Sequence, residues 1–233
     1  MRHGYIRTAA VTPKVRVADP AYNGTVICEK MDEAFAQGAV VIVFPELCIT
    51  GYTCGDLFWQ ELLLDQAREQ LFKIAEHTAG KSGIVFVGLP VMHNGKLYNA
   101  AAAVSDGKVL GLVPKTYIPN YNEFYEARYF TPGMQETVEV CLADQIVPMG
   151  TKLLFQTPAM PELRIAVEIC EDLWTPRPPS ISHALAGANL MVNLSASDET
   201  TGKNHYRREL VKGQSARLIC GYVYASAGDG EST

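Results

Sequence analysis

Three side chains that can do chemistry each follow the end of a predicted strand: the carboxylate of Glu46, the amine of Lys115 and the thiol of Cys170. In α/β sheets, ligands bind beyond the carboxyl ends of the strands, so side chains at these positions can converge. A thiol beside a carboxylate and an amine is suited to nucleophilic attack on a carbonyl carbon. The spacing is therefore compatible with a catalytic site built from three distant segments.

Each of the three groups has a distinct part in such a reaction. A cysteine attacks only as its thiolate, so a base must take the thiol proton. Glu46 can take that proton and later pass it to a leaving amine. Lys115 can hold the thiolate and donate to the oxyanion, with the backbone N–H of Glu171 as the second donor. The pattern thus favours hydrolysis through a covalent thioester on Cys170.

The remaining cysteines and the histidines favour ordinary structural roles. A lone cysteine near a strand end most often packs as a small hydrophobic residue, and we keep that interpretation for Cys48, Cys54, Cys141 and Cys220. A glutamate or lysine after a strand is most often a solvated loop charge, so strand position alone leaves the catalytic interpretation of Cys170 open. The histidines share no motif and favour no Cys–His pair: His3, His77, His93, His183 and His205.

Short apolar runs alternate with longer amphipathic stretches along the chain, which is typical of an α/β layered fold. Helical periodicity predicts helices over residues 22–37, 60–79 and 204–219. Apolar, β-branched runs predict strands over residues 5–11, 40–44, 84–89, 97–104, 108–113, 164–169, 189–194 and 222–225. Residues 114–136 contain prolines and many aromatics, so we expect a long functional loop there.

Composition excludes several classes of protein. The chain has 233 residues, 48% of them hydrophobic and 19% charged, which excludes a disordered or coiled-coil protein. A net charge of −5 disfavours nucleic-acid binding. No apolar run reaches the ~18 residues of a membrane span, so we expect no membrane partner. Without a secretion signal or a C-x-x-C pair, the six cysteines indicate free thiols in a reducing cytoplasm.

Three ordered motifs resemble the nitrilase, or carbon–nitrogen hydrolase, superfamily. They are Phe44-Pro45-Glu46-Leu47, Pro114-Lys115 with Glu123-Phe124-Tyr125-Glu126, and Glu168-Ile169-Cys170-Glu171-Asp172-Leu173-Trp174. The resemblance implies a four-layer α-β-β-α sandwich and a catalytic triad of Glu46, Lys115 and Cys170. It also implies that Glu126 is the second glutamate of the family, which orients the lysine.

Further residues resemble one branch of this superfamily, the N-terminal glutaminase domains of glutamine-dependent NAD+ synthetases. The segments that carry this likeness are 47–58, 119–126, 170–174, 193–197 and 227–233. The resemblance implies L-glutamine as substrate and a pocket formed by Tyr121, Glu171, Trp174, Ser197 and Lys203. A lysine stands at position 203 where some relatives have arginine, so a bidentate contact with the substrate carboxylate is lost there.

The same resemblance implies that residues 1–233 are a glutaminase domain that needs no cofactor or metal. Ammonia would pass to a C-terminal synthetase domain, absent from this chain, that uses ATP and Mg²⁺ to amidate nicotinic acid adenine dinucleotide to NAD+. The chain contains neither G-x-G-x-x-G nor G-x-x-x-x-G-K-[ST]. It ends in a loop after a predicted strand, so we expect a truncated domain with weak or no activity in isolation. Because relatives commonly pair through this domain, we expect a homo-oligomer.

Two alternatives remain open at the level of sequence. The first is a stand-alone amidase, nitrilase or carbamoylase of the same superfamily, which would prefer another amide or nitrile to free glutamine. The second is a non-enzymatic interaction module on this fold, against which the intact Glu46, Lys115 and Cys170 set argues.

Overall fold

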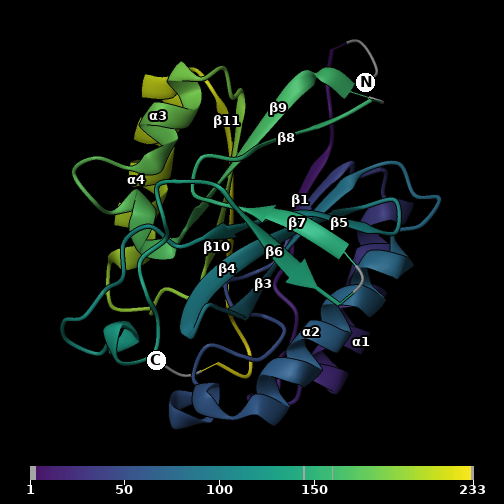
Figure 1. Ribbon diagram of the computed structural model, residues 1–233. Coiled ribbons are helices and arrows are strands. Elements are labelled where there is room, and N and C mark those ends of the chain that lie inside the picture. Colours follow the sequence, from purple (N-terminus) through teal and green to yellow (C-terminus); the bar gives the residue numbers. More distant parts are fainter. Residues whose placement is uncertain (1–3, 144, 159, 232–233) are drawn as a thin grey trace.

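The computed structural model describes residues 4–143, 145–158 and 160–231, and within them the chain folds into two β-sheets (Figure 1). The first sheet has seven strands in the order β1-β2-β3-β4-β5-β7-β6. These strands are β1 (Thr8–Ala10), β2 (Val41–Val43), β3 (Ile84–His93), β4 (Lys96–Ser105), β5 (Lys108–Pro114), β6 (Val138–Leu142) and β7 (Gln145–Met149). β1, β2 and β3 are parallel, and β3, β4 and β5 form an antiparallel meander.

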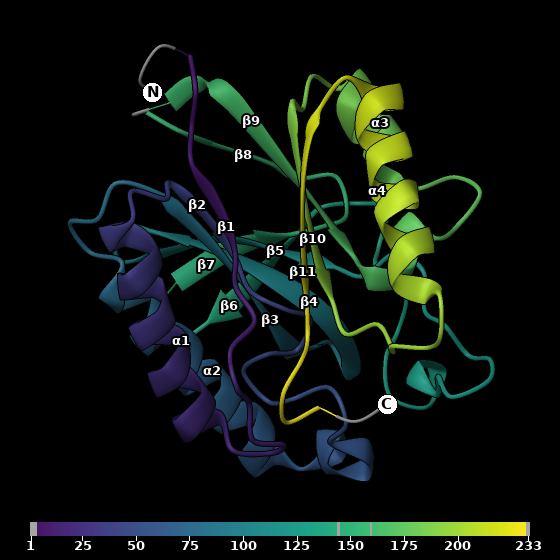
Figure 2. The same cartoon turned by 180° about the vertical axis from the view of Figure 1, so that it is seen from behind.

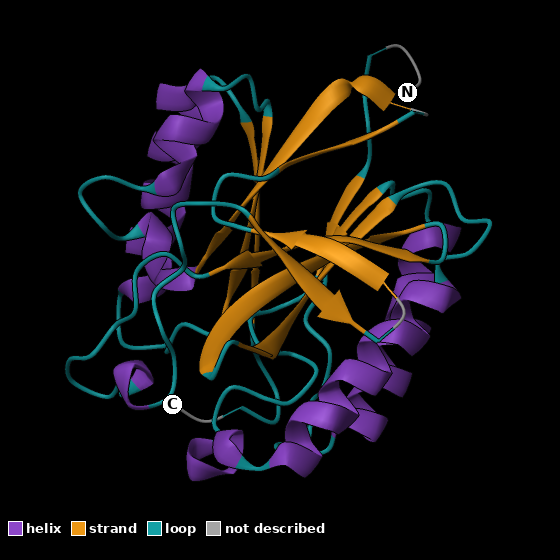
Figure 3. Ribbon diagram, viewed as in Figure 1, coloured by secondary structure: helices purple, strands orange, loops and turns teal. Residues whose placement is uncertain are grey.

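The second sheet has four strands in the order β11-β10-β9-β8, with the last three strands of the chain parallel. Its strands are β8 (Leu154–Thr157), β9 (Met160–Ile169), β10 (Leu190–Ser195) and β11 (Gly221–Ser226). The helices lie on the two outer sides (Figures 2 and 3): α1 (Pro20–Ala36) and α2 (Glu61–His77) beside the first sheet, α3 (Pro179–Leu185) and α4 (Lys203–Leu218) beside the second. The predicted α-β-β-α sandwich is confirmed.

β2 explains how the layers are held together. Its apolar run has no polar alternation because both faces of the strand are buried. Val41 and Val43 belong to the core between the two sheets, where they share a cluster with Ile165, Val167 and other residues of the second sheet. Ile42 instead joins the cluster formed with α1 and α2. The strand that leads to Glu46 is therefore fixed from two sides.

The helices predicted from periodicity are confirmed to within two residues at each end. α1 begins with Pro20 after Asp19, whose side chain accepts a hydrogen bond from the Tyr22 N–H. It ends just before Gly38, whose φ of 81° lies in the left-handed region that glycine adopts without strain. The tight β4–β5 connection is also confirmed, with Asp106 and Gly107 both at positive φ.

Three strands and one α-helix were not predicted: the two strands of the β6–β7 hairpin, β8 and α3. The hairpin strands have five residues each, and Pro148 lies inside β7, which argues against a strand in a sequence pattern. α3 has seven residues and begins with Pro179, directly after Pro178. The predicted loop over 114–136 is confirmed apart from the short 3₁₀ helix η2 (Glu126–Arg128).

A glycine lets β3 pass directly beneath the turn that carries Glu46. A Cβ atom at Gly88 would lie 2.2 Å from the Leu47 nitrogen and 2.8 Å from the Glu46 carbonyl carbon. These atoms belong to the main chain and cannot swing aside. Only glycine therefore allows the Pro45–Leu47 turn to lie this close to β3.

Candidate active site

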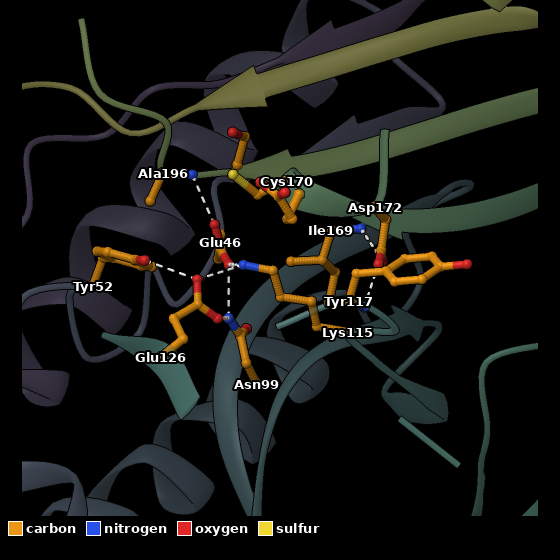
Figure 4. A network of polar contacts seen from close by, with 12 residues as sticks. Glu46, Tyr52, Asn99, Lys115, Tyr117, Glu126, Ile169, Cys170, Asp172 and Ala196 are labelled. Atoms are coloured by element: carbon orange, nitrogen blue, oxygen red, sulfur yellow. Dashed lines mark hydrogen bonds and ion pairs between the residues drawn. The ribbon is translucent and has the colours of Figure 1, made fainter. Parts of the chain in front are cut away.

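A buried ion cluster lies where the carboxyl ends of β2 and β5 meet. The Lys115 Nζ lies 2.7 Å from Glu46 Oε1 and 2.5 Å from Glu126 Oε1. Lys115 is completely buried, and both glutamates are nearly so. Figure 4 shows the side chains of Glu46, Lys115 and Glu126 directed toward one another. The structure thus brings together the three charged residues predicted from the sequence.

Three further groups hold the two carboxylates in place. The Asn99 side-chain amide donates to Glu46 Oε1 at 2.6 Å and to Glu126 Oε2 at 3.3 Å. The Tyr52 hydroxyl donates to Glu126 at 2.8 Å, and the Ala196 N–H donates to Glu46 Oε2 at 2.9 Å. Sequence reasoning missed Asn99. Its polar side chain directly precedes a run of alanines in β4, and this contrast could have drawn attention to it.

The charges of this cluster determine the protonation of its members. Burial opposes the ammonium form of Lys115, but the Glu126 and Glu46 carboxylates outweigh it and hold the pKa of Lys115 well above its ordinary value. Burial raises the pKa of Glu126, and the neighbouring Lys115 opposes that rise. The lysine is therefore a cation that donates two of its three protons to carboxylates. The third N–H is available to another acceptor.

Cys170 follows β9 directly and begins the short 3₁₀ helix η3 (Cys170–Leu173). Its φ of 41° lies in the left-handed region, which costs a non-glycine residue roughly 1–3 kcal/mol. The Cys170 N–H donates to the Asn193 side-chain oxygen at 3.1 Å. A strained turn of this kind places a nucleophile at the end of a strand, as in the strand-to-helix turns of other hydrolases.

Asp172 joins the turn of Cys170 to the segment that follows Lys115. Its carboxylate accepts from the Ile169 N–H at 3.0 Å, the Tyr117 N–H at 2.8 Å and the Thr116 N–H at 3.1 Å. Burial raises the pKa of Asp172 to about 7, although these N–H groups favour the ionised form. The carboxylate thereby fixes the positions of the thiol and the amine relative to each other.

The environment of Cys170 holds the thiol in its neutral form. Burial, followed by the Glu46 charge, raises the pKa of Cys170 to about 12. A neutral thiol is a poor nucleophile, so a base must remove its proton as the sulfur attacks. Figure 4 shows the Cys170 side chain beside the Glu46 carboxylate and the Lys115 ammonium. The geometry therefore places a base and a cation next to the sulfur.

A cavity of about 360 Å³ opens beside Cys170 and contains all five residues predicted to bind substrate. Its lining residues are Tyr121, Asn122, Glu123, Phe124, Cys170, Glu171, Trp174, Ser197, Asp198, Thr200 and Lys203. The Tyr121 hydroxyl lies 3.0 and 2.9 Å from the two oxygens of the Glu171 carboxylate. Burial raises the pKa of Glu171, and this hydrogen bond opposes the rise.

The cationic end of this cavity is built around Lys203. Its Nζ pairs with Asp198 and lies 5.4 Å from the centre of the Trp174 ring, within cation–π range. Arg207 donates to the Asp198 carbonyl at 2.9 Å and to the Ser197 hydroxyl at 3.4 Å. Sequence reasoning missed Asp198 and Arg207, because neither belongs to a motif that the sequence made recognisable.

Among the other cysteines, Cys48, Cys54 and Cys220 are buried as predicted. The packing role predicted for Cys141 is wrong, because β6 is an edge strand and Cys141 points outward from it. Across residues 4–143, 145–158 and 160–231, no three side chains of histidine, cysteine, aspartate or glutamate gather as a metal site would require. In the same ranges, no helix has the length and apolar character to cross a membrane.

The fold brings a buried glutamate, lysine and cysteine together beside a cavity, an arrangement that suits a hydrolase. The carbon–nitrogen hydrolase family model matches residues 7–227, so the chain belongs to that family. Over 232 residues it is 41% identical to the glutamine-dependent NAD(+) synthetase of Mycobacterium tuberculosis, and over 215 residues it is 32% identical to that of Aquifex aeolicus. These matches cover 100% and 92% of this chain, which spans about a third (34%) of each of the two relatives.

Solved structures show the same fold. A glutamine-dependent NAD(+) synthetase from Cytophaga hutchinsonii matches with a TM-score of 0.85 and 34% identity, over 95% of this chain and 36% of that one. An amidase from Nesterenkonia sp. matches with a TM-score of 0.76 and 20% identity, over 99% of this chain and 80% of that one. At this identity, the amidase is evidence for the shared fold alone.

Proposed function

We propose that this chain is a glutaminase domain, which hydrolyses the side-chain amide of L-glutamine on Cys170. The observation that carries the proposal is the cavity beside Cys170, whose lining combines the nucleophile with the carboxylates and the cation that a free amino acid requires. The relatives support the choice of glutamine, since they are named glutamine-dependent NAD(+) synthetases.

Charge complementarity gives the orientation of glutamine in the cavity. Glu171 and Asp198 can accept from its ammonium, while Lys203 and the Ser197 hydroxyl can donate to its carboxylate. Lys203 and Asp198 form an ion pair with each other. Bound glutamine would replace this ion pair with two, one between its carboxylate and Lys203 and one between its ammonium and Asp198. The amide end of the side chain then lies toward Cys170.

The reaction follows from the positions of four groups. Glu46 takes the thiol proton as the Cys170 sulfur attacks the amide carbon, and the third N–H of Lys115 with the Glu171 N–H stabilises the oxyanion. Glu46 returns the proton to the nitrogen, and ammonia leaves a thioester. Water, deprotonated by Glu46, attacks the thioester carbon, the C–S bond breaks and glutamate leaves, and Glu46 returns the proton to the Cys170 sulfur. Glu126 keeps the lysine charged and in place.

We further propose that residues 1–233 act within a longer enzyme of the NAD+ synthetase kind. Ammonia would pass to an ATP- and Mg²⁺-dependent synthetase domain that amidates nicotinic acid adenine dinucleotide. The extent of the match supports this, since the chain spans about a third of each of the two relatives compared above. The six free cysteines, Cys170 among them, support a reducing compartment such as the cytoplasm. A homo-oligomer paired through this domain stays a prediction.

Labelling with a glutamine-mimicking diazo ketone tests the proposal. One adduct per chain should form on Cys170, excess glutamine should suppress it, and peptide mass spectrometry should locate it. Cys170→Ala should abolish both the adduct and glutamate release, whereas the matched control Cys141→Ala should leave both unchanged because Cys141 lies on the exposed edge strand. Glutamate release that persists in Cys170→Ala would overturn the mechanism. Faster hydrolysis of a simple aliphatic amide than of glutamine would instead identify a stand-alone amidase.

A further inference from the structure

Glu168 is a completely buried carboxylate, two residues before Cys170, that the proposed reaction does not use. Its Oε1 accepts from the Tyr222 hydroxyl at 2.9 Å, and its Oε2 accepts from the Ser180 N–H at 3.1 Å. Burial raises the pKa of Glu168, and these donors oppose the rise by favouring the ionised form. A buried carboxyl group with no catalytic part calls for another role.

A chain of hydrogen bonds leads from this carboxylate to the main chain of the nucleophile. The Tyr222 oxygen accepts from Asn193 Nδ2 at 3.2 Å, and Asn193 Oδ1 accepts from the Cys170 N–H at 3.1 Å. The three side chains come from the adjacent strands β9, β10 and β11, and Asn193 pairs with Glu168 in the sheet register. The chain is therefore held by the sheet itself.

The direction of every hydrogen bond in this chain is determined by its two ends. In its ionised form Glu168 can only accept, so Tyr222 donates its single hydroxyl proton to Glu168. The Tyr222 oxygen can then only accept, so it takes the NH₂ side of the Asn193 amide. The oxygen side of that amide is thereby turned to Cys170, whose N–H can only donate. If the amide were reversed, two donors would face each other at Cys170.

We propose that Glu168 is a positioning residue that acts through Tyr222 and Asn193 to hold the Cys170 main chain in its left-handed conformation. This proposal rests on the proposed function, since it assumes that Cys170 is the nucleophile. The Cys170 N–H has the Asn193 side-chain oxygen as its acceptor, and the φ of Cys170 is 41°. Loss of its acceptor would let the turn relax and move the sulfur away from Glu46 and Lys115.

Selective ¹⁵N labelling of cysteine gives a direct measurement, because the chain then has six amide signals and Cys170→Ala identifies one of them. Tyr222→Phe removes only the hydroxyl that links Glu168 to Asn193. We expect the Cys170 amide to exchange with solvent about tenfold faster or more in this variant, with the other five signals unchanged. Tyr224→Phe, on the same strand and face, removes a hydroxyl that contacts Ser195, which is a neighbour of the Cys170 thiol and not of its N–H, so the Cys170 amide should not change.

A charge swap tests the direction of the chain. In either single variant, Glu168→Gln or Asn193→Asp, one hydrogen bond of the chain is replaced by a contact between two donors or between two acceptors. Each variant should therefore unfold at a lower urea concentration than wild type. In the double variant, the new glutamine donates to Tyr222, and Tyr222 donates to the new carboxylate at position 193, which still accepts from Cys170. Glu168→Gln should therefore restore stability when position 193 is already aspartate. Simple additivity of the two effects would overturn the proposal.

Kinetics separate this inference from the proposed function. If the wild-type chain releases glutamate, Tyr222→Phe should lower kcat about tenfold with KM for glutamine nearly unchanged, because the cavity is intact and only the nucleophile has moved. If the wild-type chain forms no glutamine-protected adduct, the proposed function fails, while the amide exchange still reports on the hydrogen-bond chain. Unchanged exchange of the Cys170 amide in a folded Tyr222→Phe variant would overturn the role of Glu168.

Discussion

Burial and hydrogen bonding shift the pKa of the Asp172 carboxyl group in opposite directions. Three backbone N–H groups from two segments converge on it, which favours the anion, while its burial favours the neutral acid and raises the pKa from 3.8 to about 7. The side chain that fixes Cys170 relative to Lys115 therefore titrates near neutral pH. Its protonation should make a measurable, pH-dependent contribution to the free energy of unfolding.

The sign of that dependence follows from proton binding. Between pH 3.8 and about 7, the folded chain keeps a proton on Asp172 that the unfolded chain has released. The free energy of unfolding contributed by this group is thus fully present below about pH 4 and falls as the pH rises through this window, by at most about 1.4 kcal/mol per pH unit. Urea unfolding of the wild type from pH 4 to 8 should show this fall.

Asp172→Asn is the matched control for this prediction. The amide cannot titrate, so the difference in free energy of unfolding between wild type and variant should shrink with rising pH and become constant above about pH 7. The NH₂ group of the new amide must also face one backbone donor, which should cost ~1–3 kcal/mol. A difference that stays constant from pH 4 to 8 would show that Asp172 does not titrate in this range.

The meeting of Glu46, Lys115 and Cys170 in one candidate site could be predicted from their positions in the sequence. Glu46 and Lys115 follow strands of one sheet and Cys170 follows a strand of the other, and side chains beyond the carboxyl ends of strands can converge. Asn99 and Arg207 could not be predicted in this way. They lie inside a strand and a helix, where only side-chain contacts across the fold show what they hold.

At the scale of elements, the fit of β3 beneath the Pro45–Leu47 turn determines where Glu46 lies. Gly88→Ala would place a methyl group 2.2 Å from the Leu47 nitrogen, so either β3 or the turn must move. We expect the free energy of unfolding to fall by ~1–3 kcal/mol. Labelling of Cys170 by the diazo ketone should also slow, because the displaced Glu46 no longer accepts the thiol proton.

Gly213→Ala provides the comparison. A Cβ atom there meets nothing within 4 Å, and the residue lies inside α4, where alanine is favoured over glycine. This variant should be more stable than wild type by about 0.5–1 kcal/mol, with labelling unchanged. Equal effects of the two substitutions would show that the approach of β3 to the turn does not position Glu46.

The elements that periodicity predicted share a property that the missed ones lack. α1, α2 and α4 are 16 or 17 residues long, so their amphipathic pattern repeats several times. The β6–β7 hairpin strands and α3 offer five to seven residues each. Contacts with neighbouring elements of the fold stabilise them, and the hydrophobic pattern of a short segment carries no information about those neighbours.

At the scale of the whole molecule, the site exists only where the two sheets meet. Glu46 and Lys115 follow strands of the seven-stranded sheet, whereas Cys170 and Ala196 follow strands of the four-stranded one. The hydrogen bond from the Ala196 N–H to Glu46 crosses between them. The core between the sheets, which contains Val43 and other residues of both, is therefore the support of the site as well as of the fold.

This arrangement predicts that reactivity and global structure are lost together. In a urea titration, glutamine-protected labelling of Cys170 should disappear at the same midpoint as the far-ultraviolet circular dichroism signal, since separation of the sheets takes the thiol away from Glu46 and Lys115. Labelling that disappears at clearly lower urea would show that the site opens locally, without separation of the sheets.

The left-handed turn at Cys170 places two demands on one position. Glycine would adopt a φ of 41° without strain and would make this part of the chain more stable. Glycine has no sulfur, however, and every other residue with a side chain would keep the strain and lose the thiol. Selection for a stable chain and selection for the proposed nucleophile thus favour different residues at this position.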